Sequence, residues 1–442
     1  MANYLFLRGN RNKKFFTNVA KELNKLGHQS YLIKFELGDL LLKSGEIQSV
    51  FAPFKVNKNE YAISNEALLG MEIYNVTYTE RILHKKVSSK TLSIYKRYMY
   101  FIDQYIDENK IDVICLFNGY HWIDQITKYL ADKKGLRVVY FEDGLFRPYT
   151  VTCDPTGINA ASSISRDPHF YEAVNFDQNR LNSFLYKPEH PLFLKSKKEN
   201  LFKVALVKSL SMFGALIGLH PNYYVHINLW QAIKYFIFKI MFSRRKNDVF
   251  TLPEEYVFVP FQVSRDTQIF YNSPRIKNME EFLDYVYQAV VRFNKENNRN
   301  LKLIVKEHPE DMSRNNYKDL KNRYKEINDV LFVEKCNMKK VIENAEAVIT
   351  INSTVGIEAL TKNQRVLTLG EALYNIEGVV HAVKNPNKLH EDLKMALSTP
   401  INTERIKKFI YYLRFSYQVE GTISIPNEQT AKNVAQRLNQ LI

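Results

Sequence analysis

The sequence predicts an α/β fold built from two Rossmann-like domains. Short apolar runs rich in β-branched residues alternate along the chain with longer segments in which apolar residues recur at helical spacing. This alternation is typical of parallel sheets with right-handed crossovers. The densest polar motifs each follow one of the apolar runs. At 442 residues the chain also exceeds the size at which a single core stops growing, so we expect two domains.

The first half opens with a strand, a loop and a helix. Residues 4–7 are strand-like, residues 15–26 carry apolar side chains at helical spacing, and Gly27 closes the helix. Further strands are predicted, in order, at residues 31–35, 113–117 and 138–141. We place the first domain at residues 1–184.

After residue 250 the same pattern restarts. Strands are predicted at residues 256–260, 301–305, 348–351 and 365–369, and helices at residues 279–294, 338–344 and 356–361. We assign residues 251–402 to the second domain. Residues 185–250 are expected to form a helical linker, and residues 403–442 a helical segment that crosses back to the first domain.

Cysteine content and the amino terminus indicate a cytosolic protein. The three cysteines show no CxxC pair and no regular spacing, which favours a reducing compartment. The first residues run into a strand without the features of a signal peptide. The segment 201–219 has near-membrane length, but Lys203 and Lys208 interrupt it, so we expect it to be amphipathic or buried.

The formal net charge of +15 points to an anionic partner. Basic residues gather around the apolar, aromatic region 195–250, which suits a surface that faces anionic lipid. No nucleic-acid motif of known mechanism occurs, so nucleic acid is not an expected partner. A solvated, lysine-rich surface that reflects composition alone is the alternative.

Two adjacent carboxylates, Glu142 and Asp143, follow the predicted strand 138–141. Adjacent carboxylates cannot both ionise without cost, so one of them is expected to have the raised pKa that a general acid or base needs. The alternative is an acidic turn in which Gly144 supplies a positive φ. The polar loop that follows contains Arg147, Asn159 and Arg166 among other polar residues, and loops this dense in charge are typical of sites.

Two motifs at strand ends of the second domain could bind a phosphorylated donor. Lys306, His308 and Pro309 follow strand 301–305, where a cation and an imidazole together suit a phosphate. His308 could instead be structural.

Ser353 and Thr354 pass from strand 348–351 into a helix, and hydroxyls with free N–H groups at a helix start bind anions. Either residue could instead be an ordinary N-cap. Glu358, about one turn later, could accept a hydrogen bond from a ribose hydroxyl.

Gln262 and Asp266 follow the first strand of the second domain. Asp266 is either a catalytic carboxylate or a loop cap. Signatures of dinucleotide, P-loop and zinc sites are absent, and so is the DxD motif of metal-dependent sugar transfer. We therefore expect neither a metal nor a cofactor.

Taken together, these motifs resemble the KpsS/LipB-type capsular polysaccharide synthesis family of bacterial β-Kdo transferases over nearly the whole chain. The residues that carry the resemblance are Phe15, Phe16, Ala20, Leu23, Gly27, His28, Phe35, Gly38 and Asp39; Glu142, Asp143, Gly144, Arg147, Pro148, Gly157, Ile158, Asn159, Ser162, Ser163, Arg166, Asp167, Phe170 and Tyr171; and Val259, Pro260, Phe261, Gln262, Asp266, Thr267, Gln268, Lys306, His308, Pro309, Ser353, Thr354, Gly356, Glu358, Ala359 and Leu360.

The resemblance implies a GT-B architecture, with parallel sheets facing a central cleft, and a retaining transfer of Kdo from CMP-Kdo without a metal. The acceptor would be a phosphatidylglycerol-type lipid or a Kdo-lipid at the inner membrane, where the protein would be peripheral, with other capsule synthesis and export proteins as partners. Asp266 would be the nucleophile, and Glu142 or Asp143 the acid/base. The implied donor site is Gln262, Lys306, His308, Pro309, Ser353, Thr354 and Glu358, and the implied acceptor site is Arg147, Asn159 and Arg166.

Three other functions stay open. An inverting GT-B transferase that uses CMP-sialic acid shares the acidic, His-Pro and Ser/Thr motifs but needs no nucleophile at Asp266. A teichoic-acid-like phosphotransferase is a second enzymatic alternative, and a non-catalytic membrane-associated subunit of a capsule assembly is the third. The front loop 8–14 is more basic and less glycine-rich than in the family, which bears on how the acceptor is bound.

Overall fold

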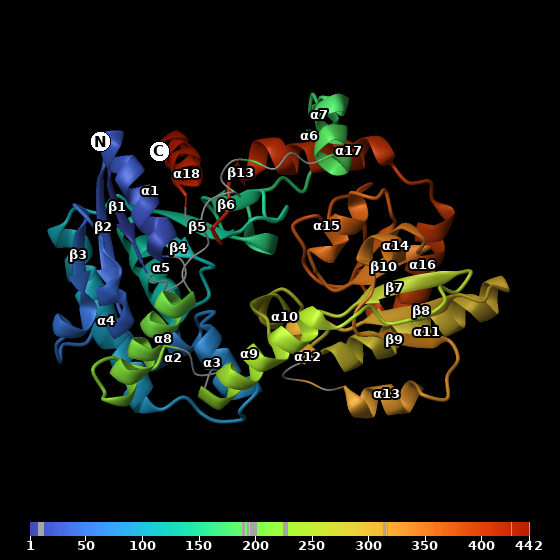
Figure 1. Cartoon of the computed structure of the whole chain (residues 1–442), viewed down its shortest axis with the longest axis horizontal. Helices are drawn as coiled ribbons and strands as arrows, with labels where there is room; N and C mark the ends of the chain where they lie inside the picture. Colours follow the sequence, from blue (N-terminus) through green and yellow to red (C-terminus); the bar gives the residue numbers. More distant parts are fainter. Residues whose placement is uncertain are drawn as a thin grey trace. The chain divides into compact units, whose positions relative to one another are not determined.

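The chain forms two α/β units, each built around its own sheet (Figure 1). The computed structural model describes residues 1–7, 13–187, 191, 194, 201–223, 229–312, 315, 317–425 and 427–441. The basic front loop 8–12 and the lysines of 195–198 lie outside the described residues. The first unit comprises Met1–Ser163, Pro188–His226 and Leu413–Ile442, and the second comprises Ile164–Lys187 and Ile227–Tyr412.

In the first unit the described residues form a seven-stranded sheet with the order β13-β6-β5-β4-β1-β2-β3. Strands β1 to β5 pair in parallel, whereas β6 is antiparallel to both β5 and β13. The strands are β1 (Asn3–Phe6), β2 (Gln29–Lys34), β3 (Gln48–Phe51), β4 (Val113–Phe117), β5 (Arg137–Asp143), β6 (Thr150–Asp154) and β13 (Val419–Glu420). The order 3-2-1-4-5 of its parallel part is that of a Rossmann sheet.

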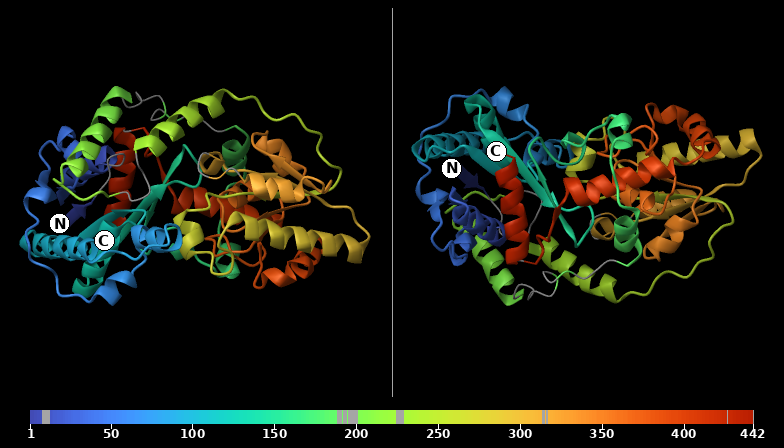
Figure 2. Two further views of the ribbon diagram at one scale, coloured as in Figure 1. Left: turned by 90° about the horizontal axis from the view of Figure 1, so that it is seen from below. Right: turned by 90° about the horizontal axis from the view of Figure 1, so that it is seen from above.

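Helices accompany this sheet in the first unit. They are α1 (Lys13–Lys25), α2 (Asn65–Leu69), α3 (Tyr74–Arg81), α4 (Ser89–Glu108), α5 (Trp122–Lys134), α8 (Leu201–Leu216) and α18 (Glu428–Gln440), with the short helices η1 (Leu37–Leu41), η2 (Ala52–Phe54) and η3 (Asn159–Ala161). Helix α18 lies beside α1 (Figures 1 and 2), and both contribute to one core with Phe6 and Phe141 of the strands. Helix α18, near the C-terminus, belongs to the first unit.

The second unit contains a six-stranded sheet within the described residues, with the order β12-β11-β10-β7-β8-β9 and parallel strand pairs. Numbered along the chain, these strands have the Rossmann order 3-2-1-4-5-6. They are β7 (Tyr256–Pro260), β8 (Lys302–Lys306), β9 (Val330–Val333), β10 (Ala347–Thr350), β11 (Val366–Thr368) and β12 (His381–Ala382). The predicted class, α/β with two Rossmann-like units on parallel sheets, is confirmed.

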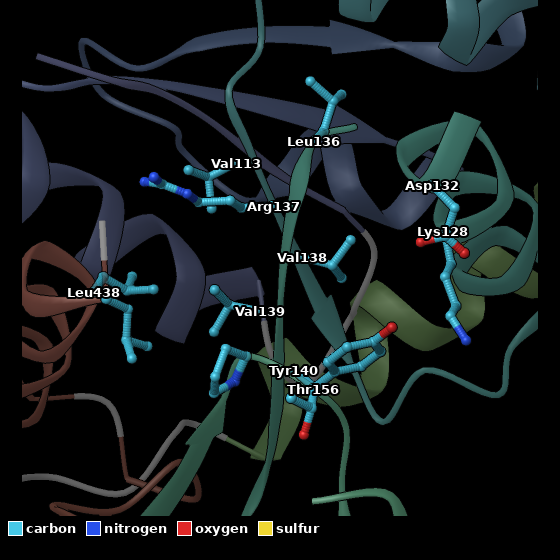
Figure 3. A pocket seen from close by; sticks show the side chains of 12 residues that line it. Val113, Lys128, Asp132, Leu136, Arg137, Val138, Val139, Tyr140, Thr156 and Leu438 are labelled. Carbon is cyan, nitrogen blue, oxygen red and sulfur yellow. The ribbon is translucent and has the colours of Figure 1, made fainter. Parts of the chain in front are cut away.

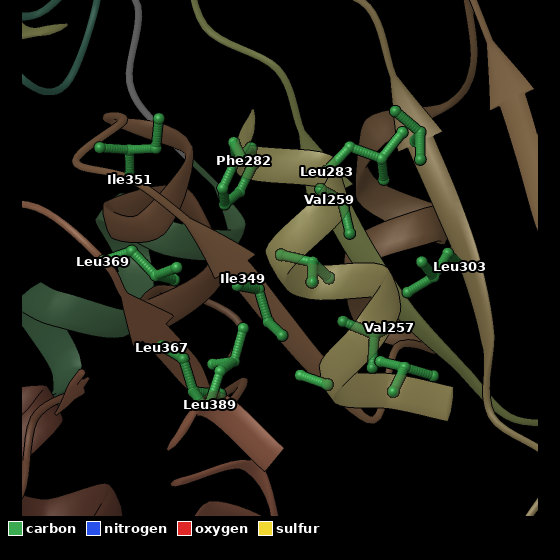
Figure 4. Packing of buried hydrophobic residues seen from close by; sticks show 14 of the residues in the cluster. Val257, Val259, Phe282, Leu283, Leu303, Ile349, Ile351, Leu367, Leu369 and Leu389 are labelled. Carbon is green, nitrogen blue, oxygen red and sulfur yellow. The ribbon is translucent and has the colours of Figure 1, made fainter. Parts of the chain in front are cut away.

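Helix α11 shows why the second unit is stable. Asn278 caps its first turn by accepting from the N–H of Glu281 at 2.8 Å, and Asn298 ends it in a left-handed conformation. Its buried residues Phe282 and Leu283 pack with the strand residues shown in Figure 4. Each such buried side chain contributes about 1.5–3 kcal/mol to the free energy of folding.

The other α-helices of the second unit are α6 (Pro168–Glu172), α7 (Gln178–Tyr186), α9 (Leu229–Arg244), α10 (Thr267–Tyr271), α12 (Pro309–Met312), α13 (Lys318–Tyr324), α14 (Met338–Glu343), α15 (Val355–Leu360), α16 (Leu389–Ser398) and α17 (Thr403–Tyr412).

The limits of the units differ from the predicted domain limits. Helices α6 and α7 belong to the second unit, because the ring of Tyr171 packs against Phe409 at 5.5 Å and Tyr412 at 5.9 Å, both in or at the end of α17. The predicted linker 185–250 is divided, with α8 in the first unit and α9 in the second. The segment 403–442 is divided as well, because α17 stays in the second unit.

None of the helices in the described part of the chain combines the length and the apolarity that a membrane span requires.

Candidate active site

Two side chains join the central strands of the second sheet where the strand order reverses. Gln262 follows β7 and Asn352 follows β10, and both are buried. Gln262 Nε2 donates to Asn352 Oδ1 at 2.8 Å, and the N–H of Asn352 donates to Gln262 Oε1 at 2.9 Å. In open α/β sheets, ligands bind outside the strand ends at such a reversal. Gln262, predicted as a donor-binding residue, therefore has its amide engaged within the protein at this point.

The same cluster fixes the start of α10. Asn352 Nδ2 donates to the carbonyl oxygens of Gln268 and Asn272, each at 3.1 Å. Gln268 is the second residue of α10 and Asn272 is its C-cap, and the helix begins directly after Asp266. The amide of Asn352 thus connects the end of β10 to the loop and helix that present Asp266.

Asp266 is the N-cap of α10. Its Oδ1 accepts from the N–H of Gln268 at 3.2 Å and from the hydroxyl of Thr267 at 3.0 Å. The loop-cap alternative is therefore realised in the structure. The carboxyl group is only partly buried, and its charge acts on His308, so the two residues are close in this unit.

His308 is held as a neutral ring. Its Nδ1 accepts from the N–H of Glu310 at 3.2 Å, so in the neutral form the proton resides on Nε2. Burial lowers the pKa of His308, although the nearby carboxylates of Glu310, Asp311 and Asp266 oppose this shift. The ring therefore presents an N–H donor near neutral pH. Pro309 is the first residue of α12, a position that favours proline.

Lys306 ends β8 beside His308. Burial lowers the pKa of its ammonium group, and Nζ donates to the carbonyl oxygen of Glu307 at 2.7 Å. Glu307 itself is buried and forms an ion pair with Lys321. The two charged residues of this motif thus differ in role. Glu307 attaches the strand end to α13 through its ion pair, whereas Lys306 is only partly buried and can contact a ligand.

Asp311 organises this part of the site and was not singled out from the sequence. It is fully buried and accepts from the hydroxyl of Ser264 at 3.1 Å, from the amide of Asn315 at 3.2 Å and from the hydroxyl of Tyr317. Ser264 lies in the loop that leads to Asp266. Asp311 therefore ties that loop to the helix that follows His308. An acidic residue three positions after His308 was the available signal, but its partners are set by the fold.

The hydroxyl motif lies at the start of α15. Thr354 occupies the N-cap position and is exposed, but its side chain makes no capping hydrogen bond. Ser353 Oγ instead accepts from the N–H of Val355 at 3.2 Å. Glu358 is on the exposed side of the same helix, and local desolvation raises the pKa of its carboxyl even though the residue is exposed as a whole. The predicted N-cap role falls to both residues, Thr354 by position and Ser353 by hydrogen bonding.

In the first unit, Glu142 is held by a residue from the neighbouring strand end. Asn118 follows β4, has a positive φ of 69°, and its Nδ2 donates to Glu142 Oε2 at 2.6 Å. Glu142 and Asp143 are consecutive residues of β5, so their side chains point to opposite faces of the sheet. The close carboxylate pair expected from the sequence is therefore not formed.

The residues predicted to bind the acceptor do not come together in one unit. Arg147 is exposed, and its Nε donates to the carbonyl oxygen of Gly144 at 3.2 Å. Asn159, with a positive φ of 52°, is also in the first unit. Arg166 belongs to the second unit, where it donates to the carbonyl oxygens of Ile164 at 2.9 Å and Leu373 at 2.6 Å.

The polar loop after β6 is built around Asp154. This buried carboxylate accepts from the N–H groups of Thr156 at 2.7 Å, Gly157 at 3.0 Å and Ser163 at 2.8 Å, and from the hydroxyl of Tyr417 at 2.9 Å. The density of polar residues in this loop was interpreted from the sequence as typical of a site. Many of these polar groups instead hydrogen-bond within the loop or attach the C-terminal segment to it.

Comparison with known proteins places these features in a family. The family model described as capsule polysaccharide biosynthesis protein matches residues 112–399. The chain belongs to this family. The match includes every residue proposed above for the donor, the acceptor and catalysis. The predicted resemblance to KpsS-type capsule proteins is confirmed.

Alignments with named relatives cover most of this chain. It is 28% identical over 364 residues to protein FixF of Sinorhizobium fredii, covering 80% of this chain and 73% of FixF. It is 28% identical over 335 residues to the capsule polysaccharide export protein KpsS of Escherichia coli, covering 70% and 78% of the two chains. Among solved structures, a β-Kdo 2,7 transferase, KpsC of Thermosulfurimonas dismutans, is similar at 16% identity and a TM-score of 0.37, over 86% and 98% of the chains. A likeness this weak says nothing about the reaction.

A hollow of about 300 Å³ lies elsewhere in the first unit of this capsule protein. Figure 3 shows Arg137, Val138 and Tyr140 of β5 lining it, with Asp132 of α5 and Leu438 of α18. These residues surround the first half of β5, whereas Glu142 lies at its end. The hollow is therefore separate from the candidate site. Across the described residues, no group of three or more His, Cys, Asp or Glu side chains is arranged to hold a metal ion.

Proposed function

We propose that this protein is a glycosyltransferase that transfers Kdo from CMP-Kdo, with retention, to a phosphatidylglycerol-type lipid or a Kdo-lipid during synthesis of a capsule linker. Membership of the capsule polysaccharide family and the resemblance of its motifs to β-Kdo transferases support the reaction class. The observation that carries the proposal is the arrangement around Asp266, next to the reversal of the second sheet and close to the neutral donor His308.

The donor phosphate would be bound at the strand ends of the second unit. His308 supplies its Nε2–H, and Lys306 supplies a positive charge. The hydroxyls of Ser353 and Thr354 and the carboxylate of Glu358 would contact the nucleotide, the last through its ribose. These groups stabilise the charge that develops on CMP as it leaves. Gln262 acts through Asn352 as a positioning residue.

Asp266 would act as the nucleophile. Its Oδ1 is oriented by Gln268 and Thr267, so we assign the attack on the anomeric carbon to Oδ2. The bond from that carbon to the CMP oxygen breaks, and an enzyme-bound sugar ester forms. The acceptor hydroxyl then displaces the carboxylate and loses its proton to Glu142, or to Asp143. Two displacements give net retention.

The acceptor would be recognised by basic and polar groups. Arg147, Asn159 and Arg166 are proposed to bind its phosphate or the Kdo carboxylate, for which arginine has the matching fork of donors. Because such an acceptor resides in a bilayer, the protein would work at the inner face of the cytoplasmic membrane. No metal or cofactor is part of this proposal.

One observation favours a second candidate. Asp266 already serves as an N-cap, a role that suits an inverting transferase using CMP-sialic acid, where no nucleophile is needed at this position.

The deciding experiment supplies purified protein with CMP-Kdo generated in situ and a short-chain phosphatidylglycerol, and follows the lipid by mass spectrometry. A Kdo-lipid with a β linkage by NMR, made by the wild type and not by Asp266→Asn, is expected. Product from CMP-sialic acid alone would replace the proposal with the inverting alternative.

A further inference from the structure

Helix α8 of the first unit exposes its large apolar side chains and buries its small ones. Its buried residues, Val207, Ser211 and Gly214, pack against η1. The exposed residues, with their exposed fractions, are Phe202 at 77%, Leu206 at 42%, Met212 at 41%, Phe213 at 52% and Leu216 at 84%. A helix that packs only on its own protein has the opposite pattern. The outward face of α8 is therefore built to meet something else.

The helix is firmly attached to the first unit. At Gly38 of η1 a Cβ atom would come within 2.1 Å of the carbonyl oxygen of Val207, so only glycine permits this close approach. Just after α8, the hydroxyl of Tyr223 donates to the carbonyl oxygen of Phe35 at 3.1 Å, and Asn75 Nδ2 donates to the carbonyl oxygen of Tyr223 at 3.1 Å. The exposed face is thus presented by a fixed helix.

Charges on α8 identify the kind of partner. Phe202, Leu206 and Phe213 share one side of the helix at spacings of four and seven residues. Successive helical residues are offset by about 100°, so these three residues, Met212 and Leu216 project within one arc of about 120°, and Lys203 and Lys208 lie just beyond its two edges. Both lysines are exposed, and residues 201–219 contain no Asp or Glu. An apolar stripe flanked by lysines is the pattern of helices that lie in a membrane interface.

We infer that the outward face of α8 docks on an anionic lipid surface. The aromatic and aliphatic side chains would enter the boundary between headgroups and acyl chains, and Lys203 and Lys208 would reach the phosphates. A second copy of the chain is the less suited occupant, because lysine is depleted in protein interfaces. On η1, against which α8 packs, Leu40 and Leu41 are exposed as well and enlarge the apolar surface. The use of this contact, to bring the enzyme to a lipid acceptor, rests on the proposed function; the docking itself does not.

Vesicle flotation tests the docking without any transfer reaction. The full chain is mixed with vesicles of phosphatidylcholine and phosphatidylglycerol in equal parts, or of phosphatidylcholine alone. For the double variant Phe202→Ser/Phe213→Ser we expect a loss of affinity of roughly tenfold or more. Lys203→Glu/Lys208→Glu is expected to lose binding to the anionic vesicles and to change binding to neutral ones little. Both variants alter exposed residues, and their melting curves should match the wild type.

The matched control is Leu26→Ser. Leu26 is 48% exposed. Leu26 precedes β2 and η1 follows it, so Leu26 and η1 lie at opposite ends of this strand. This variant should bind vesicles like the wild type. Equal vesicle binding by all variants would overturn the inference. The Phe202→Ser/Phe213→Ser variant would also overturn it by changing its oligomeric state while it binds vesicles like the wild type. Transfer to a soluble short-chain acceptor should be unchanged in the α8 variants, so failure of the docking and failure of the proposed reaction give different results.

Discussion

Gln262 Nε2 donates to Asn352 Oδ1 at 2.8 Å across the point where the strand order of the second sheet reverses. The return bond, from the Asn352 N–H to Gln262 Oε1, closes the pair. This contact holds together the ends of β7 and β10, and with them the loops that carry Asp266 and Ser353. The two loops come from residues 90 positions apart, so the pair fixes a geometry that neither loop could hold by itself.

Replacement of Gln262 by Leu should therefore destabilise the second unit. The substitution leaves the buried Oδ1 and N–H of Asn352 without their partner, and an unsatisfied buried polar group costs about 1–3 kcal/mol. Chemical denaturation should show the loss as a lower unfolding midpoint. Gln288→Leu, at an exposed position of α11, is the control and should change stability by less than about 0.5 kcal/mol. Equal effects of the two variants would contradict a special role for the pair.

Asp311 should matter for both stability and turnover. In Asp311→Ala, the hydroxyls of Ser264 and Tyr317 lose a buried charged acceptor, which is worth about 1.5–3 kcal/mol for one such bond. Because the loop of Asp266 loses its attachment to α12, we also expect a lower kcat at saturating donor. Asp319→Ala, an exposed change in α13, should leave both quantities near those of the wild type. Loss of stability with unchanged kcat would limit Asp311 to folding.

The stability of the protein should depend on the protonation of His308. Burial lowers its pKa in the folded state, so the unfolded chain binds a proton at higher pH than the folded chain does. The contribution of the neutral ring is thus present above the ordinary histidine pKa of about 6.5 and is lost as the pH falls from there through the lower folded pKa. His308→Asn keeps an acceptor for the N–H of Glu310 and removes the titration. The difference in unfolding free energy between wild type and this variant should shrink as the pH is lowered from about 7.5 to about 5. A constant difference would show that His308 does not titrate in this range.

Asn118 should position Glu142 for catalysis. Asn118→Gly keeps the left-handed backbone that the turn after β4 requires and removes the hydrogen bond to Glu142. We expect transfer activity to fall by roughly tenfold, with little change in melting temperature. Asn118→Ala removes the same bond but strains the backbone, so it should lower the melting temperature as well. An active Asn118→Gly variant would argue against Glu142 as the acid/base.

Much of this arrangement could be predicted from the sequence, because it depends on local patterns. The alternation of apolar runs with helical segments located the strands, and parallel strands bring Gln262, Lys306 and Asn352 to the same edge of one sheet. What could not be predicted depends on distant partners. Asp154 and Tyr417 are 263 positions apart, and Tyr171 packs against α17, which moves α6 into the second unit. The prediction that the carboxylates of Glu142 and Asp143 lie close together was wrong for a local reason. The strand continues through both residues, so their side chains point to opposite faces of the sheet.

The sharpest test concerns the two roles of Asp266. Asparagine caps helices about as well as aspartate, so Asp266→Asn should keep the stability of α10 within a few tenths of a kcal/mol, whereas Asp266→Ala should lose about 1 kcal/mol. Neither the carboxamide of asparagine nor the methyl group of alanine can form the covalent sugar ester, so both variants should lose transfer by roughly a thousandfold or more.

Stability and activity therefore separate the two roles of this residue. Asp266→Glu is the matched control, because it keeps a carboxylate but moves it by one methylene. It should retain weak transfer. Brief reaction with the donor, followed by mass spectrometry of the intact protein, should detect the sugar ester on the wild type and on neither Asp266→Asn nor Asp266→Ala. If Asp266→Asn transfers the sugar at the wild-type rate while Asp266→Ala is merely less stable, Asp266 is only a cap, and the reaction proceeds by a single displacement with inversion.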